Sequence, residues 1–310
     1  MKKVSIIIPY YNRPGKLDRC IESINAQKFK NFEVIVVDDC SELPPNQLET
    51  SITYVKNDMN RGPGYCRNVG LQMAKGMYVA FLDCDDYYHE KFLKETVNVL
   101  EKNSKISMVY ANGRNVNENN ETVEIRKKEI PDSKTILPTL LKNGKKWGTG
   151  GCVWRMSDII DVRWIDSRAW EDYAFAIDVA ILNNYIEPIS DALIFYDISG
   201  QDKLSNTNRQ LAVLEKNKSI LYISNSLWKS HYNPDPYIKE SILISLLDHA
   251  IELIKNKKYK SIYYKKTLQQ IKSWHGHSLY AFLVFTSFLT TSKNQLAILR
   301  KLRNYLRKTE

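Results

Sequence analysis

Three aspartates lie close together at the end of an apolar run, in the segment YVAFLDCDDYYHEKF of residues 78–92. Asp83, Asp85 and Asp86 occupy three of four consecutive positions. Like charges at this spacing repel one another and resist burial, so a chain that keeps them at the end of a strand is expected to bind a cation there. The alternative is a solvated loop that binds no ligand.

A second acidic pair follows another apolar run, in NFEVIVVDD of residues 31–39. Both runs alternate with segments of helical periodicity, RPGKLDRCIESINAQ and GYCRNVGLQMAKG, and KVSIIIPYY precedes them. The first hundred residues therefore predict a βαβαβ order and a parallel sheet covered on both faces. Ligands of such sheets bind beyond the carboxyl ends of the strands, so we expect both acidic groups at one crevice.

Several other site types are disfavoured by the sequence. It contains neither a G-x-G-x-x-G segment after the first strand nor a G-x-x-x-x-G-K-[ST] segment, which argues against a dinucleotide site and a P-loop. The five cysteines form no C-x-x-C pair, and their odd number disfavours a disulfide framework and fits a reducing cytosol. The apolar run of MKKVSIIIPYYN ends at Pro9, too early for a signal peptide, and is interpreted as a strand.

The net charge of +10 is concentrated near the end of the chain. Residues 251–310 hold thirteen Lys or Arg against two Glu, which is a net +11 and leaves −1 for the preceding 250 residues. This split predicts an acidic partner for the tail, either anionic lipid or nucleic acid. Helical periodicity runs from residue 207 onward, so we expect two domains: an α/β domain at 1–205 and an α-helical C-terminal region at 206–310.

Two tail segments bear on a membrane partner. SLYAFLVFTSFLTT, at 278–291, is apolar but too short to span a bilayer. NQLAILRKLRNYLRK, at 294–308, places leucines on one face and basic residues around it, which is typical of a helix at an anionic membrane surface. A docked helix with a solvated basic side, or a dimerising helix pair, remains the alternative.

Four blocks occur in a specific order and spacing: VSIIIPYYNR, FEVIVVDDCS, NRGPGYCRNVGLQMAKGMYVAFLDCDD and WEDYAFAI. Together they resemble the successive blocks of the inverting GT-A-fold glycosyltransferases of family 2, over about residues 1–200. The D-x-D pattern alone carries little weight, whereas the combination is specific. The resemblance implies a GT-A fold, which is a Rossmann-like, mostly parallel sheet flanked by helices.

The resemblance also implies roles for individual residues. Asp39 is similar to the carboxylate that binds the nucleotide base, although a helix N-cap is the alternative, with Ser41 as the rival cap. Arg67 matches the basic residue near the phosphates. Asp85 matches the direct metal ligand, and Asp83 the contact to ribose or metal. The remaining nucleotide contacts expected from the first block are Pro9, Tyr11 and Asn12.

The expected chemistry requires a cation and a base. A divalent ion, Mn²⁺ or Mg²⁺, stabilises the charge that develops on the leaving diphosphate. A carboxylate on the opposite side of the sugar takes the proton of the attacking hydroxyl, and this role is implied for Asp172, with Glu171 as the alternative. Such an in-line displacement inverts the anomeric centre.

The segment KKWGTGGCVWRM, at 145–156, is expected on the acceptor side of the site. Trp147, Gly150 and Glu171 are the candidate acceptor residues. The alternative is a tight turn before a buried strand, with Trp154 in the core.

The sequence thus predicts a metal-dependent inverting glycosyltransferase that uses a nucleotide sugar, with UDP favoured because most relatives use it. A glycan or lipid-linked acceptor in bacterial surface polysaccharide or glycolipid assembly is expected, at the inner face of the membrane. A transferase acting on nucleic acid is the less favoured alternative. A non-catalytic nucleotide-sugar-binding module is a further one, and the intact set of aspartates argues against it.

Overall fold

The computed structural model describes residues 3–126, 134–199, 209–232, 235–256, 258, 261–275 and 292–306. It contains a mixed sheet flanked by helices and a helical C-terminal region, which confirms the predicted fold class. The chain forms two compact units, one of residues 1–166 and 182–201 and the other of residues 167–181 and 202–310. Residues 167–181 join the helical unit, although they precede the expected boundary at residue 205.

The first half of the sheet has the predicted βαβαβ order with one further strand between the second strand and the second helix. Its elements are β1 (Val4–Tyr10), α1 (Pro14–Asn25), β2 (Phe32–Asp38), β3 (Thr53–Lys56), α2 (Pro63–Met73) and β4 (Tyr78–Phe81). β1 runs parallel to both β2 and β4, and β2 runs parallel to β3. Tyr10 is paired with Asp38, and Ile7 with Phe81, so the carboxyl ends of these strands meet at one edge of the sheet.

The other half makes the sheet mixed instead of mostly parallel. Its elements are β5 (Tyr87–Tyr88), α3 (Phe92–Lys102), β6 (Met108–Val116), β7 (Thr122–Arg126), α4 (Thr139–Asn143), η1 (Thr149–Gly151), β8 (Cys152–Arg155), α5 (Met156–Ile159) and β9 (Ile186–Asp197). β8 is antiparallel to both β4 and β6, while β6 is parallel to β9. The direction of the sheet therefore changes beside β4, the strand that leads into the aspartate cluster.

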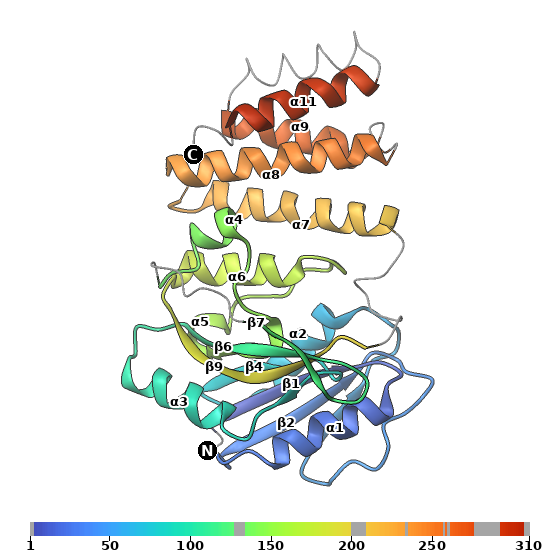
Figure 1. Cartoon of the computed structure of the whole chain (residues 1–310), viewed down its shortest axis with the longest axis vertical. Coiled ribbons are helices and arrows are strands. Elements are labelled where there is room, and N and C mark those ends of the chain that lie inside the picture. Colours follow the sequence, from blue (N-terminus) through green and yellow to red (C-terminus); the bar gives the residue numbers. More distant parts are fainter. Residues whose placement is uncertain are drawn as a thin grey trace. The chain divides into compact units, whose positions relative to one another are not determined.

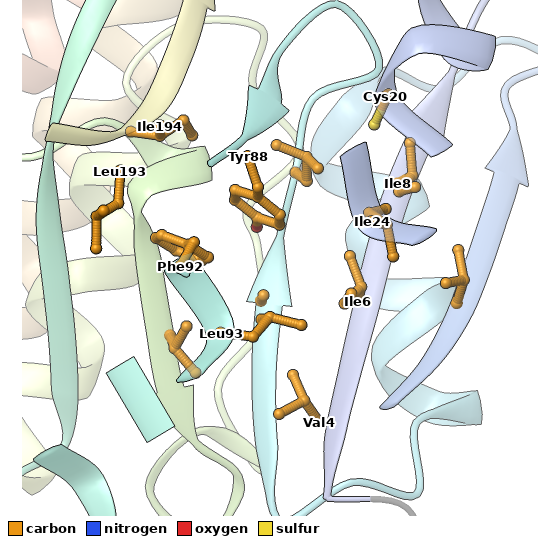
Figure 2. Close-up of a cluster of buried hydrophobic side chains, with 14 of the residues drawn as sticks. Val4, Ile6, Ile8, Cys20, Ile24, Tyr88, Phe92, Leu93, Leu193 and Ile194 are labelled. Carbon is orange, nitrogen blue, oxygen red and sulfur yellow. The ribbon is translucent and has the colours of Figure 1, made fainter. Parts of the chain in front are cut away.

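Helices cover both faces of the parallel half of the sheet. α1 and α3 lie on one side and α2 on the other (Figure 1). Figure 2 shows Ile6 and Ile8 of β1 beside Cys20 and Ile24 of α1, with Phe92 of α3 in the same cluster. All five side chains are fully buried. This apolar burial makes β1 a fixed central strand, so the loop that follows it starts from a rigid position.

Replacing Gly70 by alanine is expected to destabilise the contact between α2 and β1. A Cβ at this position would overlap Cγ2 of Ile7, so the Ile7 side chain or one of the two elements must shift. We expect the free energy of unfolding to fall by about 1–3 kcal/mol, as for other overpacked cores. Chemical denaturation followed by circular dichroism measures this change.

Gly15→Ala is the matched control for this substitution. Gly15 also lies in a helix, and among the described residues a Cβ there would meet no heavy atom within 4 Å. Its stability is expected to stay within about 0.5 kcal/mol of the parent or to rise, because alanine favours helix. If Gly70→Ala were as stable as Gly15→Ala, the close packing of α2 on β1 would be wrong.

The helical unit contains α6 (Glu171–Leu182), α7 (Arg209–Lys229), α8 (Pro236–Lys255), α9 (Ile262–His275) and α11 (Ser292–Leu306), with only the last residue of α6 assigned to the other unit. α7, α8 and α11 are stacked side by side (Figure 1). Buried polar side chains join α7 to α9: Asn217 donates to the hydroxyl of Thr267 at 3.0 Å, and the indole N–H of Trp274 donates to Ser224 at 2.8 Å. Because these hydrogen bonds lie inside the unit, they fix how α7 and α9 pack on each other.

No helix in the described ranges has the length and apolar character needed to cross a membrane. The apolar segment 278–291 lies outside the described residues. In α11, Leu299 is buried and Arg303 donates to Asp248 of α8 at 3.0 Å, while Arg300 and Lys301 are exposed. The described part of α11 therefore matches the docked helix with a solvated basic side.

Candidate functional site

The loops after β1, β2 and β4 leave the sheet next to one another. The backbone N–H of Asp39 donates to the carbonyl of Tyr10 at 2.8 Å, and that of Leu82 donates to the carbonyl of Ile7 at 3.0 Å. These bonds extend the parallel ladder past the last residues of β2 and β4. The two acidic groups therefore lie at the same edge of the sheet, on either side of β1, as expected from the sequence.

The loop after β1 is tied to the loop after β2. Asn12 has a positive φ of 54°, its N–H donates to Oγ of Ser41 at 3.0 Å, and its Oδ1 accepts from the N–H of Leu43 at 2.9 Å. Asn12 therefore holds the neighbouring loop in this structure. Tyr11 is 46% exposed, so its ring is open to a ligand, whereas Pro9 is a half-buried strand residue.

The two aspartates of the pair after β2 have different surroundings. Asp38 is fully buried and accepts from the N–H of Ser41 and the hydroxyl of Tyr54, which makes it a structural residue. Asp39 accepts from the backbone N–H of Arg61 at 2.8 Å and of Gly62 at 2.7 Å. Asp39 is thus not the cap of a helix after β2, since β3 follows next. Its carboxylate positions the loop before α2, and its contact with a nucleotide base stays a prediction.

Arg67 and Asp83 form an ion pair at the end of β4. An Nη2–Oδ1 distance of 2.6 Å joins the two groups. The Arg67 side chain is only 4% exposed and its guanidinium lies 4.4 Å from the ring centre of Trp164. Because it is enclosed by a carboxylate and an indole, Arg67 is a fixed positive charge beside a carboxylate that remains 38% exposed.

Asp85 is paired with an arginine that the sequence interpretation did not single out. Nη1 of Arg13 donates to Oδ2 of Asp85 at 2.8 Å. Arg19 donates from Nη2 to the backbone carbonyl of Asp85 at 2.8 Å and to Oδ2 of Asp197 at 2.6 Å. Arg13 precedes α1 and Arg19 lies within it, so the start of this helix supplies the charges that compensate the aspartate cluster.

Asp197, the last residue of β9, completes the acidic edge. Its N–H donates to Oδ1 of Asp86 at 3.1 Å, and Lys16 lies 3.5 Å from its carboxylate. Burial alone raises the pKa of Asp197, but hydrogen bonds from Ser199 and Arg19 outweigh it and hold the pKa below its usual value. Asp197 is therefore an anion that connects β9 to the loop after β4.

The donor atoms at this edge suit a hard divalent ion that brings further ligands with it. Within the described ranges, no three or more His, Cys, Asp or Glu side chains gather closely enough to hold a metal ion by themselves. Asp83 and Asp85 contribute carboxylate oxygens, and Mg²⁺ or Mn²⁺ is commonly held by one or two carboxylates together with phosphates and water. Asp83 and Asp85 thus fit the carboxylate part of such a site, and the remaining ligands would be phosphate and water oxygens.

Cys84, between the two aspartates, is not a nucleophile. It is buried, and burial together with the charge of Asp85 raises the pKa of its thiol to about 12. The thiol therefore stays protonated at neutral pH, and the thiolate is the reactive form.

The glycine-rich segment before β8 packs into the core. Trp147 and Trp154 are both buried, and the ring of Trp147 lies 5.4 Å from that of Tyr110. A Cβ at Gly150 would lie 2.8 Å from Cδ1 of Ile194. This is the turn before a buried strand that was the alternative interpretation. Acceptor contacts by Trp147 and Gly150 stay a prediction.

Glu171 and Asp172 occupy the first turn of α6, in the helical unit. Trp170 before them has a positive φ of 61°, and its carbonyl accepts from the N–H of Ala174 at 3.1 Å. The Trp170 ring stacks on Tyr173 at 5.2 Å. The stacked Trp170 and Tyr173 rings thus fix the backbone of the first turn of α6, which carries Glu171 and Asp172.

Residues 5–162 match the family model described as glycosyl transferase family 2. An uncharacterized glycosyltransferase of Haemophilus influenzae is 36% identical over 110 residues, which are 34% of this chain and 37% of the relative. The match thus spans little more than a third of that relative's length.

Two further relatives carry more specific names. The poly(ribitol-phosphate) beta-N-acetylglucosaminyltransferase TarS of Staphylococcus aureus is 35% identical over 130 residues, which are 37% of this chain and 22% of TarS. The UDP-Glc:alpha-D-GlcNAc-diphosphoundecaprenol beta-1,3-glucosyltransferase WfaP of Escherichia coli is 34% identical over 117 residues, which are 36% of this chain and 46% of WfaP.

Solved structures of S. aureus TarS share the fold. Residues 1–349 of TarS superpose with a TM-score of 0.66 at 18% identity, covering 99% of this chain and 92% of that chain. The complex of the same fragment with UDP-GlcNAc gives a TM-score of 0.56 at 19% identity, covering 88% of this chain and 89% of that chain.

Proposed function

The chain belongs to glycosyl transferase family 2, and from this premise we propose that it is a metal-dependent, inverting enzyme that uses a UDP-sugar to glycosylate a bacterial surface glycan or its lipid-linked precursor. TarS and WfaP are named for transfer to such acceptors, and TarS has been crystallised with UDP-GlcNAc and with UDP. The identity of the sugar and the linkage depends on loop contacts that differ among enzymes of one fold.

The observation that carries the proposal is the convergence of the loops that follow β2 and β4 on either side of β1. This edge presents the exposed ring of Tyr11 and two carboxylates, Asp83 and Asp85, each beside an arginine. We assign the nucleoside to the side of Tyr11 and Asp39 and the diphosphate to the side of Asp83 and Asp85. Arg67 then orients Asp83, because its own position is fixed by Trp164.

Asp83 and Asp85 are the residues proposed to hold Mn²⁺ or Mg²⁺. Bound there, the ion supplies a Lewis acid that stabilises the negative charge on the departing diphosphate. Arg67 and Arg13 add positive charge at the same edge, and charge of this kind that is positioned in advance is effective in the transition state.

Asp172 is proposed as the general base. A carboxylate takes the proton of the acceptor hydroxyl while that oxygen attacks the anomeric carbon, and the sugar–phosphate bond breaks on the opposite side. Inversion follows from a single displacement. Glu171 stays the alternative base, because it shares the first turn of α6.

The basic tail is proposed to bring the enzyme to an anionic membrane surface that carries the acceptor. Arg300 and Lys301 are exposed on α11 and favour contact with acidic headgroups, whereas the buried Leu299 is engaged within the helical unit. The contact is therefore expected to be electrostatic and to weaken as salt concentration rises.

A panel of nucleotide sugars tests the function. We expect one UDP-sugar to release UDP in the presence of Mn²⁺, with the release suppressed by EDTA and increased by a polyprenyl-linked or polyol-phosphate acceptor. Heat-treated protein is the control. If every nucleotide sugar is left intact with Mn²⁺ and with Mg²⁺, the catalytic proposal is wrong.

A further inference from the structure

The two arginines at the D-x-D carboxylates differ in how firmly they are held. Arg67 is 4% exposed, lies against Trp164, and pairs with Asp83. Arg13 pairs with Asp85, but its side chain is 20% exposed, and it belongs to the segment that connects β1 to α1. Arg67 has little space to move, whereas the long side chain of Arg13 reaches solvent and can change its partner.

The pairing of Arg13 conflicts with the proposed role of Asp85. A divalent ion at the Asp85 carboxylate would lie close to a guanidinium that donates to the same group at 2.8 Å. Two cations this close repel each other strongly where solvent screening is incomplete, and the Asp85 side chain is only 16% exposed. Binding of the ion therefore favours a different partner for Arg13.

A diphosphate is the partner that suits a displaced arginine. The planar guanidinium matches phosphate oxygens in a bidentate geometry, and such charge-assisted bonds are among the strong ones. Arg19 is less suited to this exchange. It donates to the backbone carbonyl of Asp85 and to the buried carboxylate of Asp197, so its bonds hold the loop that carries Asp85.

We propose that Arg13 is a diphosphate-binding residue that pairs with Asp85 until the donor binds. In the free enzyme it neutralises Asp85, and when donor and metal arrive together it exchanges Asp85 for phosphate oxygens. The inference rests on the proposed function and extends it to the order of binding. Metal alone competes with Arg13 for Asp85, whereas metal with a diphosphate offers Arg13 a new partner, so the two ligands bind cooperatively.

Binding measurements on the full chain test this exchange without relying on turnover. The probes are Mn²⁺ alone, followed by electron paramagnetic resonance of the free ion, and UDP in saturating Mn²⁺, followed by calorimetry. For Arg13→Met we expect Mn²⁺ alone to bind about fivefold more tightly, because the competing cation is gone. We expect UDP to bind about tenfold more weakly, the effect of one lost charge-assisted contact.

Two further variants serve as controls. Arg13→Lys keeps the charge but not the bidentate geometry. Its affinities for Mn²⁺ and for UDP are expected to lie between those of the parent and of Arg13→Met. Arg303→Met breaks a comparable arginine–aspartate pair, that of Arg303 with Asp248 at 3.0 Å in the helical unit. Its affinities for Mn²⁺ and for UDP are expected to equal those of the parent.

The outcomes separate this inference from the function on which it rests. If the parent protein binds UDP with Mn²⁺ but Arg13→Met matches it for both probes, the exchange alone is refuted. If Arg13→Met weakens the binding of both probes, Arg13 only holds Asp85 in place, and the exchange is again refuted. If the parent binds neither probe, the proposed function falls together with the inference.

Discussion

Asp172→Asn is expected to abolish transfer while leaving donor binding intact. Asparagine has nearly the same shape and can still accept the hydrogen bond that the N–H of Tyr173 donates to Oδ1 at 2.9 Å, but it cannot take a proton. Loss of a general base costs about 10²–10⁴-fold in rate, and we expect kcat to fall in this range. Steady-state kinetics with the active donor measures kcat, and calorimetry with UDP and Mn²⁺ measures binding.

Glu171→Gln is the matched control for this prediction. It removes a carboxylate from the same helical turn and changes the interaction with the helix macrodipole by a similar amount, about 0.3–1 kcal/mol. Its kcat is expected to remain within about threefold of the parent, because an acid that does not take the proton adds little to the rate. If Glu171→Gln is inactive and Asp172→Asn is active, the base is Glu171. If both are active, the base lies elsewhere in the chain.

Asp85→Asn is expected to remove most of the metal-dependent binding of the nucleotide. A neutral amide is a weaker ligand for Mg²⁺ and Mn²⁺ than a carboxylate, and even residues that only support a metal ligand contribute 10–100-fold to affinity. We therefore expect UDP affinity in Mn²⁺ to fall by roughly 100-fold, with no measurable turnover. The fold should persist, because Arg19 still holds the backbone carbonyl at position 85.

Asp248→Asn is the control for Asp85→Asn, because it removes an ion pair far from the proposed metal ligands in the sequence and shows what the loss of an ion pair alone does. Asp248 is paired with Arg303 at 3.0 Å, and the side chains of this pair are 24% and 32% exposed, against 20% and 16% for Arg13 and Asp85. Partly exposed pairs of this kind contribute about 0–1 kcal/mol to stability, so both variants should unfold close to the parent. Asp248→Asn should bind UDP normally. If Asp85→Asn also bound UDP normally in Mn²⁺, residue 85 would not be a metal ligand.

Local sequence patterns determined the parallel half of the sheet in the α/β unit. Apolar runs that end in aspartates predicted β2 and β4, and the helical spacing of Leu17, Cys20, Ile21 and Ile24 predicted α1, in which Ile21 is only partly buried. Side-chain periodicity is a local property, so it can be read without knowing the partner element. For the same reason the meeting of the two acidic groups at one edge followed from strand order alone.

Only the tertiary structure decided which charges face each other. Arg13 and Arg19 are 66 or more residues away from the groups they bind at Asp85 and Asp197, and no spacing rule in the sequence connects them. The same holds for Trp147, whose burial against Tyr110 depends on how the glycine segment packs on β9. Side-chain type and period specify an element and its buried face, whereas the partner of a charged or aromatic group depends on which distant segments the fold brings within a few ångströms.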